Sequence, residues 1–339
     1  MALLCVVLVG AALLFVLPHG SRHASLPPPK VFGQTPPSVA WALSWGSPDV
    51  GASLAIVGVP PGEPAIAVVA PDDARVDLPS GAPLTVGPAS AGGPEAIETA
   101  QALLNRRVGH YLVSTPQDIS ALVDRLGGVT FGAQGSAIVD GVPIGPGQAT
   151  ATGPQVAAYL TQGTGVAAWV RWEDVLSGIL DAEAKPSAWS GLTGTSDDAA
   201  VVGGLLAGAH GATVVDLPTT HTFGILKVDP EGMRAMLDSS FTTSVGGLVR
   251  VIVQNGNGLP GMGQQIGASL APYGYRVVDS QNAGTFDLAE TKIVASTDAY
   301  LVWAREAQRV LGAGRVYRDA QPTGIADITI VAGKDFGTG

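Results

Sequence analysis

The chain has 339 residues, of which 46% are hydrophobic and 14% charged, and its formal net charge is −10. This composition excludes an intrinsically disordered chain, and the length allows two globular domains. The acidic balance argues against a nucleic-acid-binding protein, because such a protein needs a basic face and the sequence has no Lys/Arg cluster beyond Arg106-Arg107. Cys5 is the single cysteine, so the chain cannot form an internal disulfide.

The first segment of the chain is an uninterrupted apolar run from Met1 to Leu17, closed by Pro18. A helix of that length rises about 26 Å, near the short limit for crossing a bilayer. We expect residues 1–18 to be an uncleaved transmembrane anchor, because no clean small-x-small cleavage site follows. A cleaved signal peptide is the alternative, and either segment would place the rest of the chain outside the cytoplasm.

Residues 19–37 are rich in proline, which favours an extended spacer between the anchor and the first domain. We expect that domain to span residues 38–241. Its segments Leu54–Val59 and Ala65–Val69 are continuous apolar runs of strand length. Such runs are typical of strands in a sheet that is covered on both faces.

Helical periodicity follows in the same domain. The clearest helix is predicted for Pro116–Leu126, with Thr115 as N-cap, proline at the first position and Gly127-Gly128 at the end. A later helix is predicted after Asp229, which would cap it, with Pro230 as its first residue. Alternating helices and strands indicate an α/β layered domain. The other predicted helices are Glu95–Asn105, Gln155–Leu160, Ala167–Leu180 and Ala199–Ala207.

Residues 248–336 are predicted to form a second, smaller α/β domain with the order β-α-β-β-α-β-β. In its last helix we expect Val302, Ala307 and Val310 to face inward. The predicted strands are 249–253, 275–278, 292–294, 315–317 and 327–331, and the predicted helices are 262–270 and 300–311.

A glycine-rich turn in this second domain has the spacing of a dinucleotide-binding fingerprint. Gly256, Gly258 and Gly261 lie between a predicted strand and helix, and Asp279 ends the next predicted strand. The remaining chain is too short for the second half of a dinucleotide-binding fold, so a plain glycine turn is the favoured interpretation.

Four segments of the first domain carry a family resemblance: Leu122–Val129, Asp140–Gln148, Val156–Leu160 and Trp169–Trp172. In that order and spacing they resemble the LytR-CpsA-Psr family of cell-envelope proteins. Residues 248–336 resemble the LytR C-terminal domain that often follows it. The resemblance implies a layered α/β/α fold in the first domain and a single-pass membrane protein with an extracytoplasmic body.

The resemblance also implies chemistry. Active members of the family transfer a polymer from a polyprenyl pyrophosphate, which requires arginines for phosphate and carboxylates for Mg²⁺. The family's arginine-aspartate pair corresponds here to Asp72-Asp73, so Asp73 is kept and Asp72 replaces the arginine. The aspartate and two arginines of a later helix correspond to Gly165, Ala168 and Arg171, of which only Arg171 keeps its family residue.

These departures favour a non-catalytic, degenerate domain with a binding or scaffolding role and no resident cofactor. Its expected partners are a polyprenyl-phosphate lipid, a wall glycan or a paralogous family member. The alternative is an active phosphotransferase that uses Asp73 as a Mg²⁺ ligand together with Arg171 and Arg75, with Arg106 and Arg107 as further candidates. The sequence offers a structural role for Arg171 as well, because Trp169 and Trp172 flank it and guanidinium groups stack on aromatic rings.

Overall fold

The computed structural model describes residues 37–46, 51–60, 62, 64–78, 83–139, 141–162, 166–183, 186–196, 199–229, 231–233, 235–236, 248–319 and 324–337. The predicted anchor 1–18, all but the last residue of the predicted spacer, and the predicted domain end at Phe241 lie outside these residues. Within them, no helix is long and apolar enough to cross a membrane.

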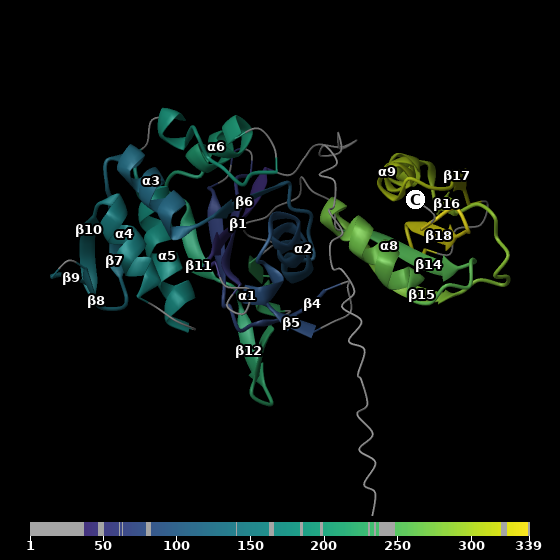
Figure 1. The fold of residues 1–339 in the computed structure, drawn as a ribbon, viewed down its shortest axis with the longest axis horizontal. Coiled ribbons are helices and arrows are strands. Elements are labelled where there is room, and N and C mark those ends of the chain that lie inside the picture. The colour runs from purple at the N-terminus through teal and green to yellow at the C-terminus, as the bar shows by residue number, and fades with distance from the viewer. Residues whose placement is uncertain are drawn as a thin grey trace, which may run out of the picture.

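Two bodies lie side by side along the long axis of the molecule (Figure 1). The N-terminal domain, residues 37–236, is built on a five-stranded sheet in the order β11-β3-β2-β1-β6. The outer pairs β11–β3 and β1–β6 are parallel, and the two inner pairs are antiparallel. The strands are β1 (Ser38–Ser44), β2 (Ala52–Gly58), β3 (Ile66–Ala70), β6 (His110–Ser114) and β11 (Thr213–Asp216).

This sheet is buried on both faces, as its continuous apolar strands predict. Successive side chains of a strand point to opposite faces, so Val57 lies in one core and Ile56 in the other. The mixed α/β class is therefore confirmed. One face is covered by α3 (Pro116–Leu126), α4 (Gly153–Thr161), α5 (Val166–Asp181) and α6 (Ala199–Gly208), and the other by α1 (Val86–Ala89) and α2 (Gly93–Leu104).

Helix α3 has the predicted ends because both are fixed by local chemistry. The Thr115 hydroxyl accepts a hydrogen bond from the Asp118 amide, and the Asp118 carboxylate accepts one from the Thr115 amide. These two bonds satisfy amides that have no partner within the helix. Gly127 ends the helix in the left-handed conformation at φ 85°. The predicted Asp229 cap is also present, since its Oδ1 accepts from the Glu231 amide at 3.1 Å, whereas Pro230 lies outside the described residues.

The sequence analysis missed the short strands of this domain. Two hairpins pair β7 (Val129–Ala133) with β10 (Gly147–Ala151) and β8 (Ala137–Val139) with β9 (Val142–Ile144). A four-stranded sheet has the order β12 (Thr219–Thr222), β13 (Ile225–Val228), β4 (Arg75–Asp77) and β5 (Pro83–Thr85). A 3₁₀ turn, η1, spans Pro186–Trp189.

The C-terminal domain has the predicted β-α-β-β-α-β-β order, with its sheet arranged β15-β14-β18-β16-β17. Strand β18 runs parallel to β14 and antiparallel to β16, so the sheet is mixed. Its elements are β14 (Val249–Asn255), α8 (Met262–Leu270), η2 (Ala271–Tyr273), β15 (Tyr275–Asn282), β16 (Lys292–Ala295), η3 (Asp298–Tyr300), α9 (Leu301–Leu311), β17 (Arg315–Arg318) and β18 (Ile328–Ala332).

One inward position in α9 was predicted wrongly. Val302 is 36% exposed, whereas Ala304 and Ala307 are fully buried and Val310 packs against the core from its edge. The 3₁₀ turn η3 occupies the position where the α-helix was predicted to begin. The buried stripe therefore follows Ala304 and Ala307, three residues apart, and Val302 lies beside it.

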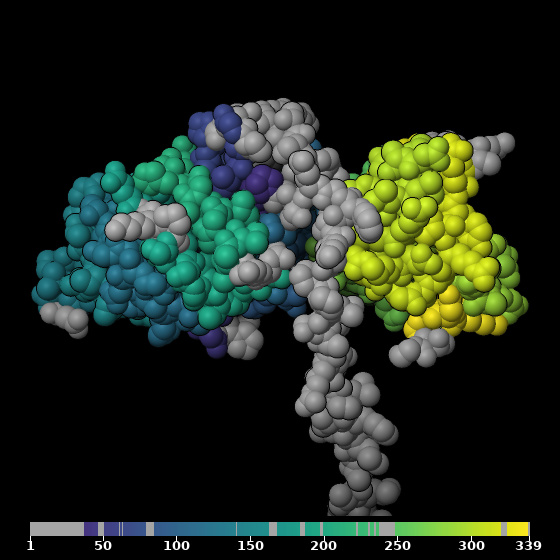
Figure 2. All heavy atoms as spheres, turned by 90° about the horizontal axis from the view of Figure 1, so that it is seen from above, coloured from purple at the N-terminus to yellow at the C-terminus, as the bar shows by residue number. Residues whose placement is uncertain are grey.

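The two domains make a packed contact through α2 and the turn after it. The Gln101 amide Nε2 donates to the Ala271 carbonyl at 2.7 Å, and Arg276 Nη1 donates to Asn105 Oδ1 at 2.9 Å. The Arg107 guanidinium lies over the Trp303 ring, 4.3 Å from its centroid. Space-filling atoms show the two domains as separate lobes, teal and green in one and yellow in the other (Figure 2).

We expect Arg107→Met to lower the thermal unfolding midpoint by about 2–6 °C, equivalent to roughly 1–2 kcal/mol. The methionine keeps an apolar stem over Trp303 but removes the charge that faces the buried Glu306 carboxylate. The matched control is Arg305→Met on the exposed face of α9. Equal melting temperatures for the two variants would contradict a stabilising role for Arg107.

Candidate functional site

The turn after β3 holds Asp72 and Asp73, the two aspartates that the sequence analysis matched to the family's arginine-aspartate pair. Ser53 Oγ donates to Asp72 Oδ2 at 2.9 Å, and the Trp45 indole donates to Ser53 Oγ at 3.2 Å. The other oxygen, Asp72 Oδ1, is buried without a hydrogen-bond partner. Burial raises the pKa of Asp72 to about 7, the Ser53 hydrogen bond opposes that rise, and the charge of Asp73 adds to it.

Asp73 is exposed beside this buried carboxyl group. Mg²⁺ prefers several ionised or carbonyl oxygens in octahedral geometry. In the part of the chain that the structure describes, no group of three or more His, Cys, Asp or Glu residues could hold a metal ion. Asp72 Oδ2 is already bonded to Ser53 and the carboxyl group is largely buried, so the exposed carboxylate of this turn is that of Asp73.

Arg171 is buried in the N-terminal domain and donates to backbone carbonyls. Its Nη1 donates to the Tyr159 carbonyl at 2.6 Å, and its Nη2 donates to the Ser136 carbonyl at 3.1 Å. Its guanidinium also lies over the Tyr159 ring, 4.8 Å from the centroid. Arg171 thereby ties α5 to the end of α4 and to the residue before β8.

The predicted stacking of Arg171 on its tryptophan neighbours was wrong. Trp172 lies in the core instead, edge-on to Trp41 with ring centroids 5.2 Å apart. Adjacent helix residues project about 100° apart, so the face of α5 that packs on the sheet takes Trp172. Arg171 consequently faces α4, where Tyr159 supplies the aromatic ring.

The next turn of α5 is acidic. The buried Asp174 carboxylate accepts from the Tyr159 hydroxyl at 2.7 Å and from the Gln134 amide at 3.0 Å. Burial raises the pKa of Glu173 to about 7, and the charge of Asp216 at the end of β11 raises it further. This part of α5 therefore carries two carboxyl groups with raised pKa values, of which that of Asp174 is buried.

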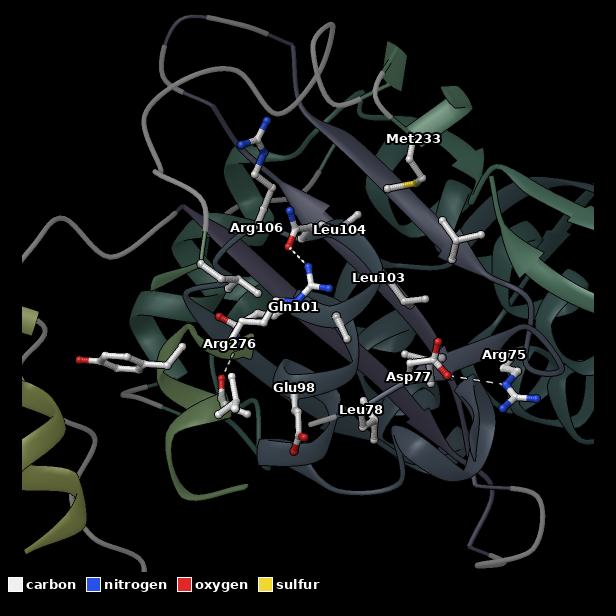
Figure 3. A pocket seen from close by; sticks show the side chains of 18 of the residues that line it. Arg75, Asp77, Leu78, Glu98, Gln101, Leu103, Leu104, Arg106, Met233 and Arg276 are labelled. Carbon is white, nitrogen blue, oxygen red and sulfur yellow. Dashed lines mark hydrogen bonds and ion pairs between the residues drawn. The ribbon is translucent and has the colours of Figure 1, made fainter. Parts of the chain in front are cut away.

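Two of the three remaining candidate arginines lie on the α2 side of the sheet, around a cavity of about 760 Å³ between the two domains, and the third, Arg107, lies over Trp303. Arg75 and Arg106 line this cavity, whereas Asp73 and Arg171 do not. Arg75 Nε lies 3.7 Å from Asp77 Oδ1; the Asp77 side chain is largely exposed, and the Arg75 side chain is partly buried. The structure thus keeps Asp73 and Arg75 close in one turn but places Arg171 away from both, among the helices on the other face of the sheet. Figure 3 shows Arg75 and Arg106 among the residues that line the cavity.

The cavity has members that the sequence analysis did not single out: Glu98, Gln101, Lys227 and Arg276. The buried position of Gln101 could have been predicted, because Gln101 lies four residues after the apolar Ile97 and so shares its helix face. The positions of Lys227 and Arg276 could not, because the neighbours of their strands β13 and β15 across the cavity are fixed only by the tertiary fold.

The glycine-rich turn is satisfied by its own side chains. Gly258 and Gly261 have φ angles of 79° and 81°, which glycine adopts without strain. Asn255 Oδ1 accepts from the Gly258 amide at 2.9 Å, and Asn257 Oδ1 accepts from the Leu259 amide at 2.9 Å. These amides are thus already bonded within the chain, which supports the plain glycine turn over a dinucleotide site.

We predict that Asp72→Asn stabilises the protein at neutral and alkaline pH. Because burial raises the pKa of Asp72 from 3.8 to about 7, the folded state holds a proton between these pH values that the unfolded chain has released. Wild-type stability therefore falls as pH rises from about 4 to about 7 and then levels off, and the asparagine variant lacks this loss. Denaturant unfolding should show the variant gaining roughly 2 kcal/mol relative to wild type between pH 5 and pH 8.5. A pH-independent difference would rule out the raised pKa.

We also expect Arg171→Lys to lower the free energy of unfolding by about 1–3 kcal/mol, because one ammonium group cannot reach both carbonyls as the guanidinium does. Arg125→Lys is a suitable comparison, since Arg125 donates to one carbonyl only, that of Ala188. Denaturant unfolding should therefore rank Arg171→Lys as the more damaging change, and the reverse order would contradict the structural role of Arg171.

Residues 248–336 match the family model described as "LytR cell envelope-related transcriptional attenuator". Similar solved structures include TagV of Bacillus subtilis, with 13% identity over 61% of this chain and 97% of that one, at a TM-score of 0.48. TagT of Bacillus subtilis has 18% identity over 65% of this chain and 96% of that one, at a TM-score of 0.48. The structure described as "LytR-CPS2A-psr family protein YwtF (TagT) with bound octaprenyl pyrophosphate lipid" has 18% identity over 67% of this chain and 99% of that one, at a TM-score of 0.47.

A comparison with curated proteins found no match. The family prediction is confirmed where the family model matches, over the predicted second domain. The chain thus carries, at residues 248–336, a domain of the LytR C-terminal family.

Proposed function

We propose that the chain is a membrane-tethered, extracytoplasmic cell-envelope protein whose N-terminal domain is a degenerate LytR-CpsA-Psr domain with a binding or scaffolding role. The LytR C-terminal domain supports the cell-envelope assignment. The apolar run at residues 1–18 supports the tether. The four sequence segments between Leu122 and Trp172 support the identity of the N-terminal domain.

The observation that carries the non-catalytic proposal is the environment of Asp72. Transfer of a phosphoryl group depends on cations placed where negative charge develops, and losing one such group typically costs 10²–10³ in rate. Here the corresponding position holds a carboxyl group that Ser53 hydrogen-bonds and the fold buries. Ionised, it would repel phosphate; protonated, it would supply no positive charge.

Arg171 supports the same proposal. Its two guanidinium nitrogens Nη1 and Nη2 donate to backbone carbonyls of the same domain. The neighbouring Glu173 and Asp174 add carboxyl groups to that face of α5. An anionic pyrophosphate placed there would meet more negative than positive side chains.

An active phosphotransferase is the second candidate, and one observation favours it. Arg75, the proposed substitute for the lost arginine, lines a cavity with apolar side chains. This alternative requires Asp73 to bind Mg²⁺ and Arg75 to hold the phosphate. It therefore makes a metal-dependent prediction that the binding role does not share.

The deciding experiment measures binding of a glycan-linked polyprenyl pyrophosphate to the detergent-solubilised chain with and without Mg²⁺. It also measures release of polyprenyl phosphate when peptidoglycan is present to accept the glycan-phosphoryl group. For a binding protein we expect the same affinity, within about threefold, with Mg²⁺ or with EDTA, and no release. Asp73→Ala should leave that affinity unchanged. Binding that requires Mg²⁺ and is lost in both Asp73→Ala and Arg75→Ala would establish the transferase instead.

A further inference from the structure

The cavity between the domains concentrates positive charge in an acidic protein. Its lining includes four basic residues, Arg75, Arg106, Lys227 and Arg276, and two acidic ones, Asp77 and Glu98, in a chain of net charge −10. Both domains contribute to it, and its volume of about 760 Å³ falls within the range of small-molecule sites.

The basic residues lie at two ends of the cavity. Arg75 of β4 is the backbone partner of Lys227 in β13, so the two side chains leave the same face of that sheet. Arg106 and Arg276 lie at the other end, where Arg276 Nη1 donates to Asn105 Oδ1 at 2.9 Å. Figure 3 shows Arg75 and Asp77 well apart from Arg106 and Arg276.

Apolar side chains separate these two ends. The wall between them is built by β4, α2 and the helix after β13, and its apolar members are Val76, Leu78, Leu103, Leu104 and Met233. Gln101 also lines the cavity; its Nε2 donates to the Ala271 carbonyl, and its Oε1 accepts from the Val108 amide. A basic end next to an apolar wall suits a ligand with one anionic and one hydrocarbon part.

Two buried polar atoms of the lining have no hydrogen-bond partner: Arg106 Nε and Glu98 Oε1. A buried group left unpaired costs about 1–3 kcal/mol. An anionic oxygen from a ligand would satisfy the Arg106 donor. In Figure 3, Glu98 lies near Leu78 and well apart from Arg106, and burial raises the pKa of Glu98 to about 7.

We propose that this cavity binds an anionic amphiphile with a single hydrocarbon chain, whose phosphate or carboxylate contacts Arg106 and Arg276 and whose chain lies along Leu103, Leu104 and Met233. The site is separate from the turn at Asp72–Asp73. Because Arg276 belongs to the C-terminal domain and Arg106 to the N-terminal domain, an occupied site links the two.

Photo-crosslinking tests this in the full chain in neutral detergent. The probe is dodecyl phosphate with a diazirine in its chain, and the control probe carries the same chain on a maltoside headgroup. Mass spectrometry should place the phosphate label in residues 98–106 and 271–277, at least fivefold above the maltoside label. Equal labelling by both probes, or labelling outside the cavity only, would overturn the proposal.

Variants separate recognition from general adhesion. The double change Arg106→Gln and Arg276→Gln should reduce labelling of the cavity at least tenfold, whereas Arg305→Gln on exposed α9 should not change it. Ala102 also lines the cavity, so Ala102→Glu should abolish labelling that the neutral Ala102→Gln, of nearly equal size, largely retains. The two Ala102 variants keep the test valid if the double arginine change loosens the domain contact. Unchanged labelling in both the double arginine variant and Ala102→Glu would refute the site.

Competition identifies the headgroup. Displacement of the probe by unlabelled dodecyl phosphate and not by laurate assigns a phosphate ligand, and displacement by laurate assigns a carboxylate. Both results support an anionic amphiphile. Displacement by inorganic phosphate alone, at the same concentration, would show that the hydrocarbon wall contributes nothing and would overturn the proposal.

Discussion

The arrangement of the two domains depends on helix α2, which is buried against the central sheet on one side and against the C-terminal domain on the other. Its apolar stripe, with Ala96, Ala100 and Leu104, packs on the central sheet. Its polar residue Gln101 is also buried, at 3% exposure, because Gln101 hydrogen-bonds to the C-terminal domain. A buried amide group requires such partners, since leaving it unpaired costs about 1–3 kcal/mol. Helix α2 therefore both completes the first core and fixes where the second domain docks.

The basic residues of the N-terminal domain have different environments on the two sides of the sheet. Among those that the structure describes, Arg125 and Arg171 donate to backbone carbonyls of their own domain. The turn after α2 directs Arg107 onto Trp303 of the C-terminal domain. The basic residues that line a cavity are Arg75, Arg106 and Lys227, all on the α2 side of the sheet. The carboxyl groups of Glu173 and Asp174 in α5 lie on the other side of the sheet.

Long periodic segments were predictable because their information is local. Helix α3 was predicted with the correct ends, since Thr115, Pro116 and Gly127 mark them chemically. The hairpins β8–β9 and β12–β13 were missed because strands of three or four residues are too short to show a period. The sequence analysis singled out Arg171 but predicted the wrong contacts for it. Its true partners are backbone carbonyls, which no sequence pattern marks. The cavity unites positions from Arg75 to Val277 that only the tertiary fold brings together.

The site at Asp72 differs from a family site by more than one substitution. An aspartate that merely replaced an arginine in an open turn would be solvated, and its pKa would stay near 4. Here Trp45, Ser53 and Asp72 form a chain of hydrogen bonds, and the Asp72 carbonyl also accepts from the Gly87 amide at 2.9 Å. A guanidinium group at this position would have to displace that chain. The surrounding residues thus accommodate a buried acid at this turn, and this environment supports the proposal that the N-terminal domain binds a ligand without transferring phosphate.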